Sequence, residues 1–404
     1  MNPNLSRLQA YPFERLRQLF SDITPSAAYK PISLGIGEPR HATPELIKKA
    51  YCDAINSPTG GLSAYPATAG DASLRQTIAA WVQRRYALEI DANTQILPVN
   101  GSREALFAFA QTVITPTKQD ENRPLIVCPN PFYQIYEGAA YLCGAEPYFV
   151  PSNPQRNFAQ DWDSVPAEMW QRTQLLYVCS PGNPAGAVMP LTEWQKLFDL
   201  SDRYGFVIAS DECYSEIYFR DTPPLGGLQA AAQLGRADFK NLLIFTSLSK
   251  RSNVPGMRSG FCAGDAALVK QFLLYRTYHG SAMSPVVQTA SVAAWNDEQH
   301  VADNRAQYRT KFAQVTPLLA DVLDVALPDA GFYLWAGVKG SDTEFARALY
   351  AQYNVTVLPG SYLAREFNGF NPGAGRIRMA LVAETAECLD AAQRIVHFVQ
   401  TQQP

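Results

Sequence analysis

Short apolar runs, each closed by turn-forming residues, recur through the middle of this 404-residue chain. They are "PLIVCPNP" at 124–131, "LLYVCSPGNP" at 175–184, "GFVIASDE" at 205–212 and "NLLIFTSLSK" at 241–250. Between several of them lie segments such as "LTEWQKLFDLSDRYG" at 191–205, whose apolar spacing is typical of a helix. Strands that alternate with helices predict an α/β fold, in which a mostly parallel sheet is covered by helices on both faces.

Polar residues follow these runs directly, among them Asn183, Asp211 and Lys250. Parallel strands end at one common edge of their sheet, and ligands of α/β proteins bind at that carboxyl edge. We therefore expect these three side chains to meet in one site.

The chain length indicates about two domains, because a domain typically holds roughly 100 to 200 residues. The last hundred or so residues contain long helical stretches and the short strand signals "GFYLWAGV", "VTVLPG" and "GRIRMALV". Near the N-terminus, "PISLGIGEP" is an isolated strand signal that needs partners elsewhere. We predict a large domain at 46–290 and a smaller α+β domain formed by 1–45 and 291–404.

Composition excludes several classes of protein. Hydrophobic residues make up 47% and charged residues 18%, which is typical of globular chains, and the net charge of −3 offers no basic excess for nucleic acid. The seven cysteines are scattered without a CxxC pair and only four histidines occur, so we expect free thiols and no metal site. No run of about 18 apolar residues and no signal core occur, so we expect a cytoplasmic protein without a membrane segment.

The strongest local motif is "SLSKRSNVPGMRSG", which places Ser247, Lys250 and Arg258 around one lysine. Most lysines are solvated surface residues. Lys250 instead follows a buried strand run directly, where burial and a nearby Arg258 favour a nucleophilic amine.

This segment resembles the cofactor-lysine motif of the fold type I, class I and II aminotransferases, and the resemblance covers nearly the whole chain. It implies an enzyme dependent on pyridoxal 5'-phosphate, in which Lys250 carries the cofactor as a Schiff base and later moves the proton from the substrate Cα to the cofactor C4′. Ser247 and Arg258 would hold the cofactor phosphate, because a guanidinium grips phosphate oxygens in pairs.

The same resemblance gives roles to three residues that follow other strands. Asp211 in "SDECYSEI" matches the carboxylate that keeps the pyridine nitrogen protonated, and Tyr214 matches the residue that bonds the phenolic oxygen. Asn183 in "CSPGNPAG" matches the asparagine of the "NPTG" motif, with Ala185 in place of the usual threonine. Without the resemblance, Asp211 would be a helix cap and Asn183 part of a plain turn.

Two further segments are expected at the cofactor. "VNGSREALFAFA" is a glycine turn that opens a helix, and backbone N–H groups at a helix start bind anions, so Gly101, Ser102 and Arg103 are predicted to cradle the phosphate. In "PNPFYQIYEGA", Tyr133 stands where the family stacks an aromatic ring on the pyridine.

The resemblance also predicts the substrate contacts. Arg378 in "GRIRMALV" matches the arginine that binds the substrate α-carboxylate, while Gly37 and Asn183 are expected beside the same carboxylate. Tyr65 resembles the tyrosine that reaches the phosphate of the neighbouring subunit's cofactor, which implies a homodimer with shared sites. Arg40 stands in "EPRH" where the family often has "EPDF", and we predict that it binds distal carboxylates of the substrate.

Within the family, "ISLGIGEPRHATPELI" and "LPGSYLAREFNGFNPGAGRIRMALVAE" are most similar to the N-succinyldiaminopimelate aminotransferases, enzymes of bacterial lysine synthesis that use glutamate as amino donor. Other possibilities are an aspartate, aromatic or acetylornithine-type aminotransferase, or a carbon–sulfur lyase on the same fold. A cofactor-sensing transcription regulator is the remote alternative, because it would need a fused DNA-binding module.

Overall fold

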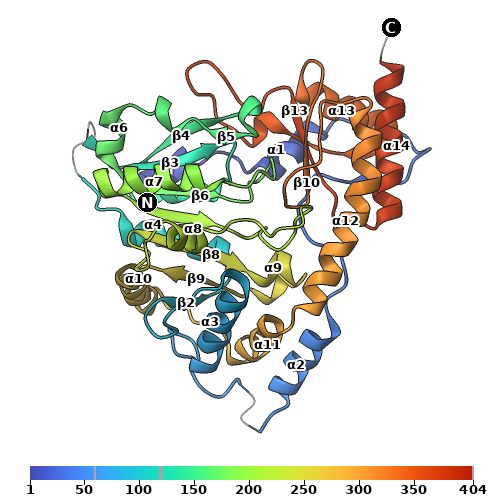
Figure 1. Ribbon diagram of the computed structural model, residues 1–404. Helices are drawn as coiled ribbons and strands as arrows, with labels where there is room; N and C mark the ends of the chain where they lie inside the picture. The colour runs from blue at the N-terminus through green and yellow to red at the C-terminus, as the bar shows by residue number, and fades with distance from the viewer. Residues whose placement is uncertain (59–60, 118–121, 403–404) are drawn as a thin grey trace.

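The computed structural model describes residues 1–58, 61–117 and 122–402, which form a large sheet of eight strands in the order β2-β9-β8-β7-β6-β3-β4-β5 (Figure 1). The five strands from β8 to β4 run parallel, while β2, β9 and β5 pair antiparallel with their neighbours. The predicted, mostly parallel sheet is therefore confirmed. Its strands are β2 (Ile96–Val99), β3 (Leu125–Asn130), β4 (Glu146–Asn153), β5 (Ala159–Gln160), β6 (Thr173–Cys179), β7 (Val207–Asp211), β8 (Leu242–Ser247) and β9 (Gly260–Gly264).

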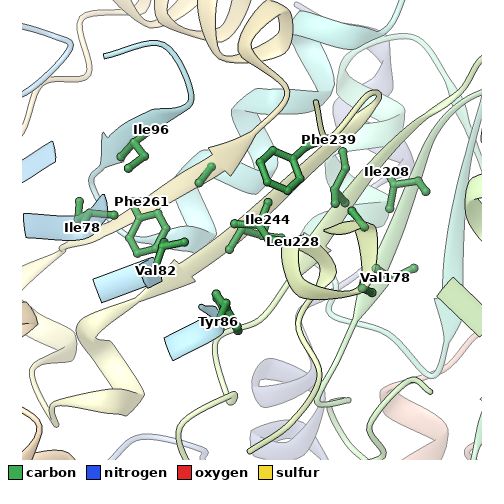
Figure 2. Packing of buried hydrophobic residues seen from close by; sticks show 14 of the residues in the cluster. Ile78, Val82, Tyr86, Ile96, Val178, Ile208, Leu228, Phe239, Ile244 and Phe261 are labelled. Carbon is green, nitrogen blue, oxygen red and sulfur yellow. The ribbon is translucent and has the colours of Figure 1, made fainter. Parts of the chain in front are cut away.

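Helices bury both faces of this sheet. Alternate residues of β8 pack on opposite faces of the sheet. Ile244 belongs to one hydrophobic cluster, whereas Leu243 and Phe245 belong to another. The cluster of Ile244 also includes Val82 and Leu228 from covering helices (Figure 2). One face is covered by α3 (Ala72–Tyr86), α7 (Leu191–Tyr204), α8 (Gly227–Gln233) and α11 (Pro285–Asn296), and the other by α4 (Ser102–Val113), α5 (Ile135–Leu142) and α10 (Ala266–His279).

A second, smaller body joins the two ends of the chain. The isolated strand signal near the N-terminus is β1 (Ile32–Ser33), which pairs in parallel with β11 (Val355–Thr356). The Leu34 carbonyl accepts a hydrogen bond of 2.7 Å from the Ala380 N–H. An antiparallel sheet of β10 (Tyr333–Gly337), β13 (Arg376–Ala380) and β12 (Leu358–Pro359) lies beside helices α12 (Gln299–Ala320), α13 (Asp342–Tyr353) and α14 (Thr385–Thr401).

The exact domain limits stay a prediction. In Figure 1, α12 runs from the end of α11 up to α14, so it extends from the large body into the small one. Helix α2 (Glu45–Ile55) packs against α11. The remaining helices are α1 (Pro12–Leu19), α6 (Ala167–Arg172) and α9 (Leu248–Arg251). Within the part of the chain that the structure describes, no helix is both long and apolar enough to span a membrane.

Candidate active site

A cavity of about 560 Å³ lies where the parallel strands of the large sheet end. It gathers most of the residues that the sequence predicted for the site. Those that line it are Gly37, Ser102, Arg103, Tyr133, Asn183, Asp211, Tyr214, Ser247, Lys250, Arg258 and Arg378. Segments separated by more than three hundred residues thus meet in one place.

Lys250 and Asp211 reach this cavity from neighbouring parallel strands. Asp211 is the last residue of β7, and Lys250 lies in α9, which follows β8 without a loop. The Asp211 side chain is buried, and its Oδ2 accepts a hydrogen bond of 2.8 Å from the Tyr136 hydroxyl. Burial raises the pKa of Asp211, while hydrogen bonds from Cys213 and Tyr136 and the nearby Lys250 charge act to lower that pKa. These donors therefore help to keep a buried carboxylate ionised.

Replacing Tyr136 by phenylalanine should lower turnover about tenfold or more, because a hydrogen bond to a charged group contributes roughly 1.5 to 3 kcal/mol. Without the Tyr136 hydroxyl, the buried Asp211 would lose one of the donors that favour its charged form. Steady-state kinetics at several pH values would check this, since the loss should be largest at low pH.

Tyr177→Phe is the matched control. Tyr177 stacks on Tyr136 with ring centroids 4.4 Å apart, but its hydroxyl donates to the Leu106 carbonyl at 2.7 Å. This variant should be less stable yet keep the kinetics of the unaltered protein. Equal losses in both variants would show that Tyr136 acts through packing alone.

The start of α4 and the loop before β9 form one wall of the cavity. Gly101, the N-cap of α4, has φ +88°, and a Cβ there would collide with the Arg258 guanidinium. Arg258 itself has φ +52°, a rare conformation for a residue with a side chain, and such strain is concentrated at functional sites. Ser102 and Ser247 line the same wall. Backbone N–H groups, two hydroxyls and a guanidinium together suit an anionic group such as a phosphate.

Arg378 also lines the cavity. Its guanidinium is buried and donates to Asn183 Oδ1 and to the Gly35 carbonyl, both at 3.0 Å. It also lies 4.3 Å from the centre of the Tyr333 ring. Its Nε finds no hydrogen-bond partner among the described residues. Gly37 lies against Tyr333 so closely that a Cβ would collide with the ring hydroxyl.

Gly101 is not among the residues that line the cavity, but it directly precedes Ser102, which does line it. Two other predicted residues lie elsewhere. Arg40 is exposed and pairs with Glu387 on α14 at 3.2 Å, and it is not among the residues that line the cavity. The Tyr65 side chain is fully exposed on this single chain. The role of Arg40 at the substrate and that of Tyr65 at a neighbouring subunit stay predictions.

Several tyrosines of the site were missed from the sequence. Tyr136 bonds Asp211, the Tyr333 hydroxyl lies 3.1 Å from that of Tyr214, and Tyr11 lines the cavity from the segment just before α1. Tyr136 and Tyr333 lie inside apolar runs, where an aromatic residue is ordinarily part of the core. Nothing in the local sequence distinguishes them from core residues.

The chain as a whole is similar to known proteins. Residues 29–395 match the family model of the aminotransferases of class I and II. A curated LL-diaminopimelate aminotransferase of Aquifex aeolicus is 32% identical over 90% of either chain. The crystal structure of an aminotransferase from Neisseria meningitidis is 54% identical, with a TM-score of 0.94 over 99% of this chain and 100% of that one. For aminotransferase AspB of Helicobacter pylori the identity is 34% and the TM-score 0.87, over 98% and 100% of the two chains.

Proposed function

Because this chain belongs to the class I and II aminotransferases, we propose that it transfers an amino group between glutamate and N-succinyl-2,6-diaminopimelate. The observation that supports the reaction type is the single cavity lined by Lys250, Asp211, Asn183 and Arg378. These residues offer an amine, a buried carboxylate, an amide and a guanidinium to one small molecule. The proposal of a succinylated substrate is supported by the segments at 32–47 and 358–384, which resemble those of the N-succinyldiaminopimelate aminotransferases.

The enzymes of this family use pyridoxal 5'-phosphate, and the residues present fit that cofactor. We assign its phosphate to the wall of Gly101, Ser102, Ser247 and Arg258, where the missing Cβ of Gly101 leaves room for the Arg258 guanidinium. When bound, the cofactor draws off the electron pair that is left at the substrate Cα.

The protein's own side chains then have separate tasks. Asp211 would hold the proton on the pyridine nitrogen, and its burial makes this ion pair stronger than it would be in water. Asn183 and Tyr214 would donate to the phenolic oxygen, while Tyr133 would pack against the ring. Lys250 would first hold the cofactor through its amine and then carry the proton that leaves the substrate Cα.

Arg378 would bind the α-carboxylate that all amino acid substrates share. Its unpartnered Nε and its contact with Asn183 suit this role, because a substrate carboxylate would complete the donor set. The Gly37 backbone would lie beside the same carboxylate. We also propose a cytoplasmic homodimer in which the exposed Tyr65 reaches the neighbouring subunit's site.

A second candidate substrate is free LL-diaminopimelate. The relatives that match about nine tenths of this chain at 32% identity carry the name of LL-diaminopimelate aminotransferase. The two substrates differ only in whether the distal nitrogen bears a succinyl group, so the cofactor chemistry is the same for both.

A substrate panel separates these candidates. The holoenzyme would be given N-succinyl-LL-diaminopimelate, LL-diaminopimelate, aspartate, phenylalanine and N-acetylornithine, each with 2-oxoglutarate, and glutamate formation would be measured. We expect the highest kcat/KM for the succinylated compound. A higher value for LL-diaminopimelate would transfer the assignment to the second candidate, and release of pyruvate from cystathionine without a keto acid would indicate a lyase.

A further inference from the structure

A second cavity, of about 490 Å³, adjoins the candidate active site. The two cavities share Tyr11, Arg103, Gln134 and Arg258 in their walls. We call this second cavity the side chamber. The far end of a substrate that is too long for the first cavity can extend into this chamber.

Charge in the side chamber is uneven. Its two acidic side chains are each matched by an arginine: Glu137 by Arg365, with contacts of 2.8 and 2.6 Å, and Glu104 by Arg276 at 2.6 Å. Arg103 forms no ion pair with any residue that the structure describes, and the other unpaired cation, Arg258, belongs to the wall assigned to phosphate. The lining is therefore positive where it meets the active site.

Arg103 is placed at the border of the two cavities. It is the second residue of α4, and its exposed guanidinium lies 5.5 Å from the centre of the Tyr11 ring. Such a contact holds a cation over an aromatic face while its N–H groups stay free for an anion. The backbone N–H of Arg103, in the first turn of α4, can still serve the phosphate, because the proposal uses only its side chain.

We propose that Arg103, held by Tyr11, binds the distal carboxylate of the substrate in the side chamber. This inference refines the proposed function and rests on it for the identity of the substrate. It assigns to Arg103 the task that the sequence suggested for Arg40, which pairs with Glu387 outside both cavities. The ligand class is a dicarboxylate. Its second carboxylate lies several carbons beyond the α-carboxylate that Arg378 would bind.

The next residue, Glu104, supports the same ligand class. Its Oε1 accepts from Arg276, while its Oε2 is buried without a hydrogen-bond partner among the residues described. A diaminopimelate carries a nitrogen next to its distal carboxylate. Arg103 and Glu104 both line the side chamber, so they place a donor and an acidic side chain near that end of the molecule.

Binding of two unreactive acids to the holoenzyme tests the proposal. Pimelate has the carbon chain and both carboxylates of diaminopimelate but no amine, and heptanoate lacks the second carboxylate. By calorimetry, the unaltered enzyme should bind pimelate about tenfold or more tightly than heptanoate, because a charge-assisted hydrogen bond is lost with the second carboxylate. Arg103→Gln should remove this preference, and Arg103→Lys should keep part of it.

Arg40→Gln is the matched control and should leave the preference for pimelate unchanged. If Arg103→Gln weakens both acids equally, or weakens neither, the proposal is wrong. A loss of bound cofactor in Arg103→Gln, measured by absorbance, with the preference intact would assign the side chain to the phosphate instead. The binding assay needs no turnover, so an enzyme that rejects both diaminopimelates would overturn the proposed function and leave this test valid.

Discussion

Replacing Lys250 by alanine is expected to reduce turnover about 10⁴-fold or more, the upper range for losing a positioned proton carrier. Lys250 would lose two tasks at once, because the same amine holds the cofactor and moves the proton at the substrate Cα. It lies in α9 directly after β8, in the cavity that also contains Asp211. Single-turnover measurements with each substrate would give the size of the loss.

Two control variants separate the effect of the positive charge at residue 250 from that of its reactive amine. Lys250→Arg keeps the positive charge but should be as inactive as Lys250→Ala, since a guanidinium is a poor nucleophile and does not give up its proton. Lys270→Ala removes an exposed lysine of α10 and should leave turnover unchanged. An active Lys250→Ala protein would end this mechanism.

Asp211→Asn is expected to lower turnover about 1,000-fold, which corresponds to roughly 4 kcal/mol of lost stabilisation of the charge at the substrate Cα. The amide has the shape of the carboxylate but cannot hold a proton on the pyridine nitrogen by ion pairing. Tyr136 would still donate to the remaining oxygen, so the fold should be little changed. Turnover and cofactor affinity would be measured together.

The next residue supplies a matched control. Glu212 is also a buried carboxylate, but it accepts from Ser210, Tyr86 and the Gly227 N–H, away from the cavity. Burial raises the pKa of Glu212 to about 7. Glu212→Gln should therefore change stability more than turnover. A loss of turnover as large as that of Asp211→Asn would show that any buried amide at the end of β7 disrupts the site.

Much of the fold follows from local sequence signals. The four apolar runs correspond to β3, β6, β7 and β8, and the segment from Leu191 is α7. Strand β4 was not predicted, because its sequence "EPYFVPSN" contains two prolines, which disfavour a central strand. Strand β9, "GFCAG", is short and bounded by glycines, so its apolar signal is weak.

The site was predictable where a polar residue ends a strand or comes shortly after it, as Asp211, Asn183 and Lys250 do. Their meeting depends only on strands ending at one edge. The contacts of Arg40 and Arg103 depend instead on tertiary neighbours that are far away in sequence. Glu387, on the last helix, pairs with Arg40, and Tyr11, near the N-terminus, lies by Arg103. No local pattern indicates which arginine stays unpaired.

The most direct test of the account is to reduce the holoenzyme with borohydride and to map the modified peptide by mass spectrometry. Before reduction the protein should be yellow, and afterwards the visible absorbance should vanish while the cofactor mass stays on the chain. We expect this mass on Lys250 alone. A cofactor fixed on another lysine, or a protein that binds none, would contradict it.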